Sequence, residues 1–247
     1  MSFNGQSPFS NIPPVVKNLI IINIILLLAA FVFKSMGINL NRTLGLFYPG
    51  SPEFQPYQFI THMFMHGGIA HLFFNMFALF MFGRVLEQVW GSKRFFIYFF
   101  FTGIGAAVLH SFVIYLEAQQ VMANLSIDQI EQVRQQGTDL FLHQKTFTNT
   151  SMRDLQLLFN IPTVGASGAV FGVLLAFGMY FPNTQLMLLF PPIPIRAKYF
   201  VIIYGAIELY LGFTQANSNI AHFAHLGGML FGFILIKIWA RKRNTFY

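Results

Sequence analysis

Six long apolar runs are the feature that most constrains how this chain can fold. A helix that crosses a membrane needs about 20 consecutive apolar residues. The chain is 55% hydrophobic and only 9% charged, and its 32 phenylalanines suit a surface that faces lipid. The sequence therefore predicts an all-α polytopic membrane protein with a bundle of six helices. The predicted spans are residues 15–37, 62–83, 95–116, 164–182, 198–214 and 219–240.

The remaining sequence is predicted to form three segments around a membrane domain that covers residues 15–240. Residues 1–14 form an N-terminal cytoplasmic segment with neither the basic region nor the cleavage site of a removable signal peptide, and residues 241–247 form a basic cytoplasmic tail. A polar insertion at about 117–160 separates the third and fourth spans. Its stretch LSIDQIEQVRQQ predicts a short amphipathic helix.

The distribution of basic residues indicates how the bundle is oriented. The formal net charge is +7, but the basic residues stand at the ends of apolar runs, which favours membrane orientation over nucleic-acid binding. With both termini in the cytoplasm, ten basic residues lie inside and five outside. The inner set is Lys17, Arg84, Lys93, Arg94, Arg196, Lys198, Lys237, Arg241, Lys242 and Arg243, and the outer set is Lys34, Arg42, Arg134, Lys145 and Arg153. The chain has no cysteine, which excludes disulfides and cysteine-ligated metals.

This orientation places polar residues of three spans at a similar depth in the outer half of the membrane. Ionisable residues inside a membrane are costly and are usually functional. The polar residues are His62, His66, His71 and Asn75 in the second span, Ser167 in the fourth, and His222 and His225 in the sixth.

The types of these residues point to nucleophilic catalysis. A serine becomes a good nucleophile when a histidine takes its proton, and the reaction then needs donors for a developing oxyanion. Ser167 and a histidine of the sixth span supply the first pair. His71 and Asn75 are spaced i, i+4 on one helical face, and the free N–H groups at the start of the fourth span can also donate.

Glycines near these residues predict close helix packing. Gly165 lets the backbone turn tightly just before the serine. Gly168 and Gly172, like Gly228 and Gly232, are four residues apart, a spacing that lets membrane helices approach closely. These pairs are expected to bring the fourth and sixth spans together.

Of the two histidines in AHFAHLGG, His225 is predicted to be the base. It lies one turn deeper than His222, and Gly228 and Gly232 follow it at i+3 and i+7 on the same helical face. His222 is then expected to be an interfacial histidine near the rim of the site.

The motifs GASG with Gly172, HGGIAHLFFN, AHLGGMLFG and VLEQVWGSKR together resemble the rhomboid intramembrane serine proteases over residues 62–240. The resemblance implies a rhomboid-like bundle around a water-filled cavity, with Ser167 and His225 as a catalytic dyad and His71 and Asn75 at the oxyanion. It implies single-span membrane proteins as substrates, the lipid bilayer as surroundings, the bacterial cytoplasmic membrane as location, and no cofactor, metal or nucleic acid.

The chain departs from the family pattern in three places. Tyr57-Gln58 stands where members often carry Trp-Arg, Phe171 replaces a tyrosine that stacks on the catalytic imidazole, and the polar insertion is longer than in compact members. Glu208, in the fifth span, could orient the histidine as a third member. The dyad of the family favours a structural or cavity-facing role instead.

Two other functions are compatible with parts of the sequence. Paired histidines on two spans could hold a metal or haem, although no HExxH motif is present. A non-catalytic relative could bind membrane segments without cutting them, but the presence of both serine and histidine favours an enzyme.

Overall fold

The computed structural model describes residues 12–187, 192–214 and 222–243, and most of them are helical. The predicted terminal segments lie largely beyond these ranges, since residues 1–11 and 244–247 are outside the described residues. Five of the described helices are long and apolar enough to cross a membrane. They are α1 (Pro14–Ser35), the continuous helix Ile69–Trp90, α6 (Ser92–Met122), α10 (Ala197–Thr214) and α11 (His222–Arg243). The prediction of an all-α polytopic bundle is confirmed.

The predicted fourth span is a shorter apolar helix, α9 (Ser167–Tyr180), of 14 residues. At 1.5 Å per residue it is about 21 Å long, less than the hydrocarbon thickness of about 30 Å. Its first turn faces the middle of α6, because Gly168 packs on Ala106. The helix therefore begins inside the bundle and not at the membrane surface.

The second span begins later than predicted. Residues before it form α3 (Gln58–Thr61) and the 3₁₀ turn η1 (His62–Phe64), and α4 (Ile69–Ala78) starts only after Gly68, which is fully extended. The helix then runs through a π-helical turn, η2 (Leu79–Gly83), into α5 (Arg84–Trp90). The prediction that His62 and His66 lie within the span was wrong, because the glycine pair Gly67-Gly68 stops the helix from extending back to them.

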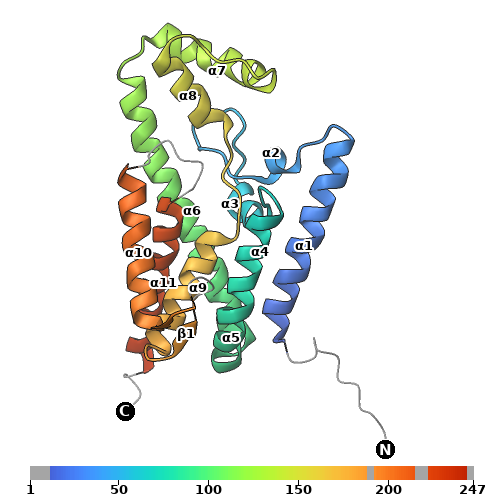
Figure 1. Cartoon of the computed structure of the whole chain (residues 1–247). Coiled ribbons are helices and arrows are strands. Elements are labelled where there is room, and N and C mark those ends of the chain that lie inside the picture. The colour runs from blue at the N-terminus through green and yellow to red at the C-terminus, as the bar shows by residue number, and fades with distance from the viewer. Residues whose placement is uncertain (1–11, 188–191, 215–221, 244–247) are drawn as a thin grey trace, which may run out of the picture.

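The helices form a bundle in which α11 makes its largest interfaces with α6 and α9. Figure 1 shows α1 and α10 on opposite flanks, with the first residues of α1 and the last turns of α11 at the same end of the bundle. The short α2 (Leu40–Leu44) lies toward the other end. Because the described chain starts and finishes at one end, the arrangement is that of an even number of passes.

The polar insertion is mostly helical, and it forms a cap over one end of the bundle (Figure 1). The predicted amphipathic helix is present as α7 (Ile127–Leu142), which begins with a capping box between Ser126 and Gln129. A second helix that was not predicted, α8 (Thr150–Asn160), begins at an Asn149 cap. The two helices pack around a small apolar core of their own with the end of α6. Its buried residues are Tyr48, Ala118, Val133, Met152, Leu155 and Phe159.

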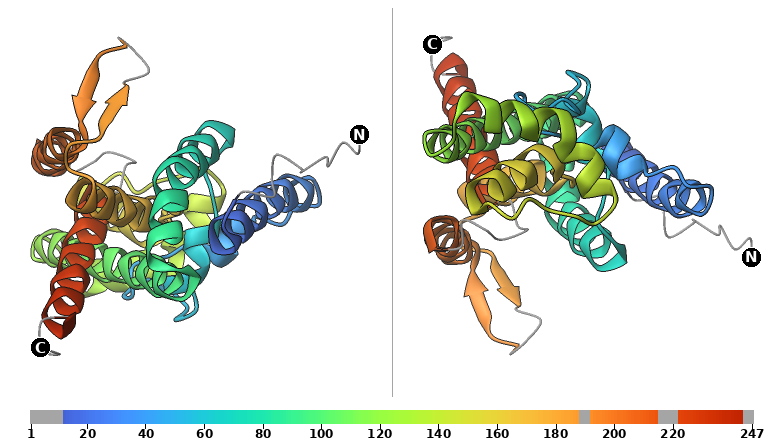
Figure 2. Two further views of the ribbon diagram at one scale, coloured as in Figure 1. Left: turned by 90° about the horizontal axis from the view of Figure 1, so that it is seen from below. Right: turned by 90° about the horizontal axis from the view of Figure 1, so that it is seen from above.

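A short antiparallel hairpin, also unpredicted, joins α9 to α10. Its strands β1 (Gln185–Met187) and β2 (Pro194–Arg196) pair Gln185 with Arg196 and Met187 with Pro194. Seen along the bundle, the hairpin projects away from the other helices beside α10 (Figure 2).

Glu87 fastens α1 to the rest of the bundle. Its carboxylate is buried, with 2% of the residue exposed, and it accepts hydrogen bonds from the N–H groups of Val15 and Val16 at 2.9 and 2.8 Å. It also accepts one from the Ser92 hydroxyl at 2.7 Å. The N–H groups in the first turn of a helix have no partner within the helix, and the helix dipole favours a negative charge there.

We expect Glu87→Ala to lower the free energy of unfolding by about 3 kcal/mol, because it leaves the N–H groups of Val15 and Val16, the second of them buried, without an acceptor. Thermal unfolding in detergent measures this change. Glu131→Ala, which removes an exposed carboxylate of α7, is the matched control and should leave the unfolding midpoint unchanged. Equal midpoints for the two variants would contradict the assigned role of Glu87.

Candidate active site

The loop before α9 is held by backbone hydrogen bonds to two other segments. Leu46 and Thr163 exchange N–H···O=C bonds of 2.9 and 2.8 Å, and the Gly165 N–H donates to the His62 carbonyl at 2.9 Å. Ser167 follows as the first residue of α9. These bonds fix the path of the chain just before the serine. The position of Ser167 therefore depends on the segments that contain Leu46 and His62.

Gly165 is the position in this loop that requires a glycine. Its φ is +129°, and a Cβ there would lie 2.8 Å from Cε1 and Nε2 of His71 and 3.7 Å from the Ser167 Oγ. The imidazole of His71 therefore lies directly against the Gly165 backbone and close to the serine.

Ser167 and His225 form a close pair between α9 and α11. The Oγ of Ser167 lies 2.9 Å from Nε2 of His225, so the hydroxyl can donate to that nitrogen when the ring is neutral. Phe171 stacks on the imidazole, with ring centroids 4.1 Å apart and planes 5° apart. The stacking fixes the ring plane, and it needs no tyrosine hydroxyl.

Contact between two glycines brings α9 and α11 together. A Cβ on Gly228 would overlap the carbonyl of Gly168, so the backbones of the two helices touch at this point. The second glycine of each pair faces α6 instead: a Cβ on Gly172 would meet Thr102 at 2.7 Å, and one on Gly232 would meet the Tyr98 hydroxyl. The glycine spacing thus serves a three-helix contact, whereas the sequence suggested a two-helix one.

His71 and Asn75 lie on α4, beside the serine loop. Nδ1 of His71 accepts a long hydrogen bond, 3.4 Å, from the Gly67 N–H, which leaves Nε2 to carry the proton of the neutral ring. The amide of Asn75 is buried and donates to the His71 carbonyl at 3.0 Å, with its second N–H available. Both side chains can donate to an anion, as can the first N–H groups of α9.

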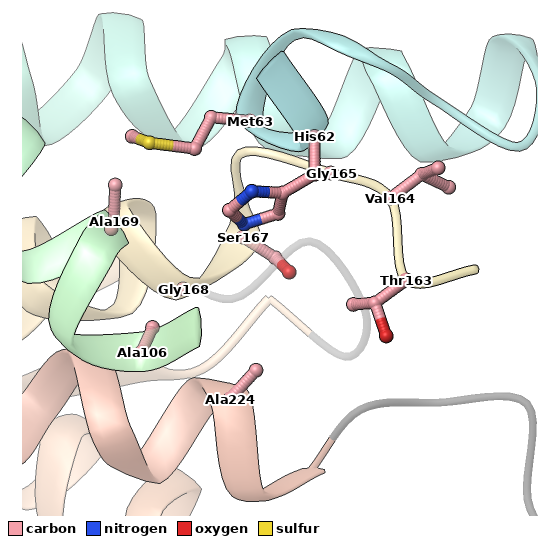
Figure 3. Close-up of a pocket in the computed structure, with 11 residues that line it drawn as sticks. His62, Met63, Ala106, Thr163, Val164, Gly165, Ser167, Gly168, Ala169 and Ala224 are labelled. Carbon is pink, nitrogen blue, oxygen red and sulfur yellow. The ribbon is translucent and has the colours of Figure 1, made fainter. Parts of the chain in front are cut away.

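A small pocket adjoins Ser167 and is lined by residues of η1, α6, the loop before α9, α9 and α11 (Figure 3). His62 lines it, and its Nδ1 is bound to the Gln58 carbonyl at 2.8 Å. His110 of α6 is bonded through Nε2 to the hydroxyl of Thr163 at 2.8 Å. His66 is buried, and its ring lies edge-on to that of His71.

The departure at Tyr57-Gln58 has a clear structural consequence. Gln58 is buried, and its Oε1 accepts hydrogen bonds from the N–H groups of Phe47 and Gln55 at 3.2 and 3.1 Å. Its Nε2 donates to the Glu53 carbonyl at 3.1 Å. The glutamine amide therefore holds the loop that precedes α3 through these three hydrogen bonds.

Glu208 lies beside the two histidines of α11. One of its oxygens, Oε2, accepts a 2.7 Å hydrogen bond from Nδ1 of His222. The same oxygen lies 2.9 Å from Nδ1 of His225, but a ring N–H on that nitrogen would not point at it. This contact is therefore electrostatic and is not a hydrogen bond. Within the described residues, these three side chains are also the group whose ligand atoms are close enough to share a metal ion, within 4.8 Å of one another.

Apolar membrane-spanning helices around a serine–histidine pair define a multi-pass integral membrane protein with a candidate hydrolytic site. The family model of the Rhomboid domain matches residues 53–242. The match covers more than half of the sequence, and the chain belongs to the rhomboid family.

Three relatives illustrate the similarity. The chain is 26% identical over 191 residues to the putative rhomboid protease YdcA of Bacillus subtilis, covering 77% of this chain and 71% of that protein. It is 28% identical over 177 residues to the rhomboid protease GluP of the same organism, covering 72% and 25%. It is 26% identical over 183 residues to the rhomboid protease AarA of Providencia stuartii, covering 70% and 52%. The chain thus spans about a quarter of GluP and about half of AarA.

We expect Gly228→Ala to lower the free energy of unfolding by about 3 kcal/mol, because the new methyl group must push the Gly168 carbonyl and α9 away. Thermal unfolding in detergent measures the loss. Gly205→Ala on α10 is the matched control, since its Cβ would meet only the flexible end of Met229 at 3.2 Å. A Gly228→Ala variant as stable as Gly205→Ala would show that the two backbones do not touch.

Proposed function

We propose that the chain is an intramembrane serine protease that hydrolyses peptide bonds in or near transmembrane segments of membrane proteins. The observation that carries the proposal is the 2.9 Å contact between Ser167 Oγ and His225 Nε2 inside the membrane bundle of a rhomboid family member. Relatives named as rhomboid proteases support the same activity.

The geometry supports acyl transfer with Ser167 as nucleophile and His225 as general base. Nε2 of His225 takes the hydroxyl proton while Oγ attacks the carbonyl carbon of the scissile bond. The protonated imidazole then gives this proton to the leaving amine, and Oγ remains bound to the acyl group. Water, activated by the same nitrogen, hydrolyses the ester and restores the serine.

In this proposal, three kinds of donor stabilise the carbonyl oxygen as it becomes negative. They are the Ser167 N–H at the start of α9, the Asn75 amide and the Nε2–H of His71. Donors fixed in position before the reaction stabilise a developing oxyanion without having to reorganise, which is the main source of acceleration in such sites.

The setting of the site supports single-span membrane proteins as substrates and the bilayer as surroundings. Ser167 begins a helix that starts within the bundle, so a scissile bond must enter that interior. The excess of basic residues at the end where α1 begins and α11 finishes supports cytoplasmic termini and a site in the outer half of the bacterial cytoplasmic membrane.

We expect Ser167→Ala to abolish cleavage of a model single-span substrate in proteoliposomes, because the nucleophile is lost. Mass spectrometry after treatment with a fluorophosphonate should find the adduct on Ser167 in the unsubstituted protein. Ser111→Ala, which changes a buried serine of α6, should keep both cleavage and labelling. Cleavage by Ser167→Ala would refute the mechanism.

We expect Asn75→Ala to lower kcat by about 10²–10³-fold while changing KM little, since an oxyanion donor acts in the transition state. Asn23→Ala is the matched control: Asn23 is also buried and donates to a carbonyl four residues earlier, Leu19, but on α1. A higher KM with unchanged kcat in Asn75→Ala would assign this residue to substrate docking instead.

A further inference from the structure

Glu208 is a carboxylate held inside the membrane bundle. It lies in the second half of α10, a helix of 18 residues that is apolar enough to cross the membrane, and 6% of the residue is exposed. Carboxylates in such places are costly and are found where a partner or a function compensates for them. Its partners are the two histidines at the start of α11.

The two nitrogens of the His225 ring face different groups. Nε2 is hydrogen-bonded to the Ser167 hydroxyl at 2.9 Å, and Nδ1 lies 2.9 Å from the Glu208 carboxylate without a formed hydrogen bond. A carboxylate next to Nδ1 favours the tautomer with the proton on that nitrogen. Nε2 is then left unprotonated, which is the state that can accept the serine proton.

His222 holds the carboxylate in place. Its Nδ1 donates to the same oxygen at 2.7 Å, and the residue is buried, with 4% exposed. The rings of His222 and His225 stand perpendicular to each other, with centroids 6.5 Å apart. Oε2 is therefore held by a hydrogen bond from a second histidine of α11.

We propose that Glu208 is a positioning residue for His225, which sets its tautomer and balances its charge during proton transfer, and that His222 orients Glu208. The proposal rests on the proposed protease function. It turns the predicted dyad into a serine–histidine–glutamate arrangement, and it replaces the structural or cavity-facing role that the sequence favoured for Glu208.

Other groups that can carry charge also lie within electrostatic range of His225. They are His71 on α4 and His110 on α6, besides Glu208 on α10 and His222 on α11. His71 and His110 can only be neutral or positive, so neither can stabilise a protonated His225. On α9, Ser167 and the stacked Phe171 are uncharged. The carboxylate of Glu208 is thus the group that opposes the positive charge formed on His225 when it takes the serine proton.

The first test compares Glu208→Gln with the unsubstituted protein in proteoliposomes. Glutamine keeps the size of the side chain, and its carbonyl can still accept the His222 hydrogen bond, so the fold is retained while the charge is lost. We expect kcat to fall about 10- to 100-fold, the range for removing an opposite charge a few ångströms from an ionising group. KM should stay within about twofold, because the proposed role of Glu208 acts through His225 and not through substrate binding.

The rate of fluorophosphonate labelling provides a readout that does not depend on the peptide substrate. It should fall in parallel with kcat in Glu208→Gln, and Glu208→Asp, which restores the charge, should recover part of both. His222→Leu, which removes the hydrogen bond to Oε2, should lower both rates less than Glu208→Gln does. The matched control is Glu87→Gln, which removes the charge of another buried carboxylate; it should lower stability but leave kcat and the labelling rate unchanged.

Wild-type kcat and labelling in Glu208→Gln would overturn the proposal, and so would loss of activity in wild type on treatment with a metal chelator, which would assign the three side chains to a metal. Ser167→Ala distinguishes these outcomes from failure of the protease function. If Ser167→Ala is inactive while Glu208→Gln is fully active, the protease function stands and the role of Glu208 falls.

Discussion

The backbone contact between Gly168 and Gly228 is the constraint on which the site depends. Membrane helices gain no hydrophobic free energy by leaving lipid for one another, so they associate where small residues allow close packing. Ser167 immediately precedes one glycine of this contact, and His225 lies one turn before the other. The 2.9 Å distance between their reacting atoms is therefore a consequence of how closely two helix backbones approach. Phe171 fixes the plane of the His225 ring by stacking on it, and the loop at Gly165 fixes the path of the chain just before Ser167.

The two buried carboxylates show how the same cost is met in different ways. Glu87 is compensated by backbone N–H groups and a hydroxyl, which are fixed donors that join α1 to the bundle. Glu208 is compensated by two imidazoles, one of which also contacts the nucleophile. The donors around Glu87 keep their protons, so this carboxylate has a structural role. The imidazoles around Glu208 can gain or lose a proton, so the interactions of this carboxylate change when a histidine is protonated.

The sequence was sufficient to predict the helical bundle, which follows from hydrophobic run length. It also proposed Ser167 and His225 as a pair, from their similar depth and from the glycine spacing on each helix. It was not sufficient to predict where α4 begins, since the glycines at 67 and 68 interrupt an apolar run that hydropathy reads as continuous. The packing of Gly172 and Gly232 against α6, and the contact of Glu208 with His225, depend on how separate helices cross. Spacing within one helix shows which residues share a face, but not which neighbouring helix each part of that face meets.

The cap formed by α7 and α8 has a mechanical consequence. Helix α6 is 31 residues long, about 46 Å at 1.5 Å per residue, so it extends well past a hydrocarbon layer of about 30 Å and carries the cap into water. Only residues 161–166 separate the end of α8 from Ser167. Within that short tether, Thr163 is pinned to Leu46 and to His110. A displacement of the cap is therefore transmitted through these six residues to the nucleophile. The contacts of Thr163 with Leu46 and His110 resist such a displacement.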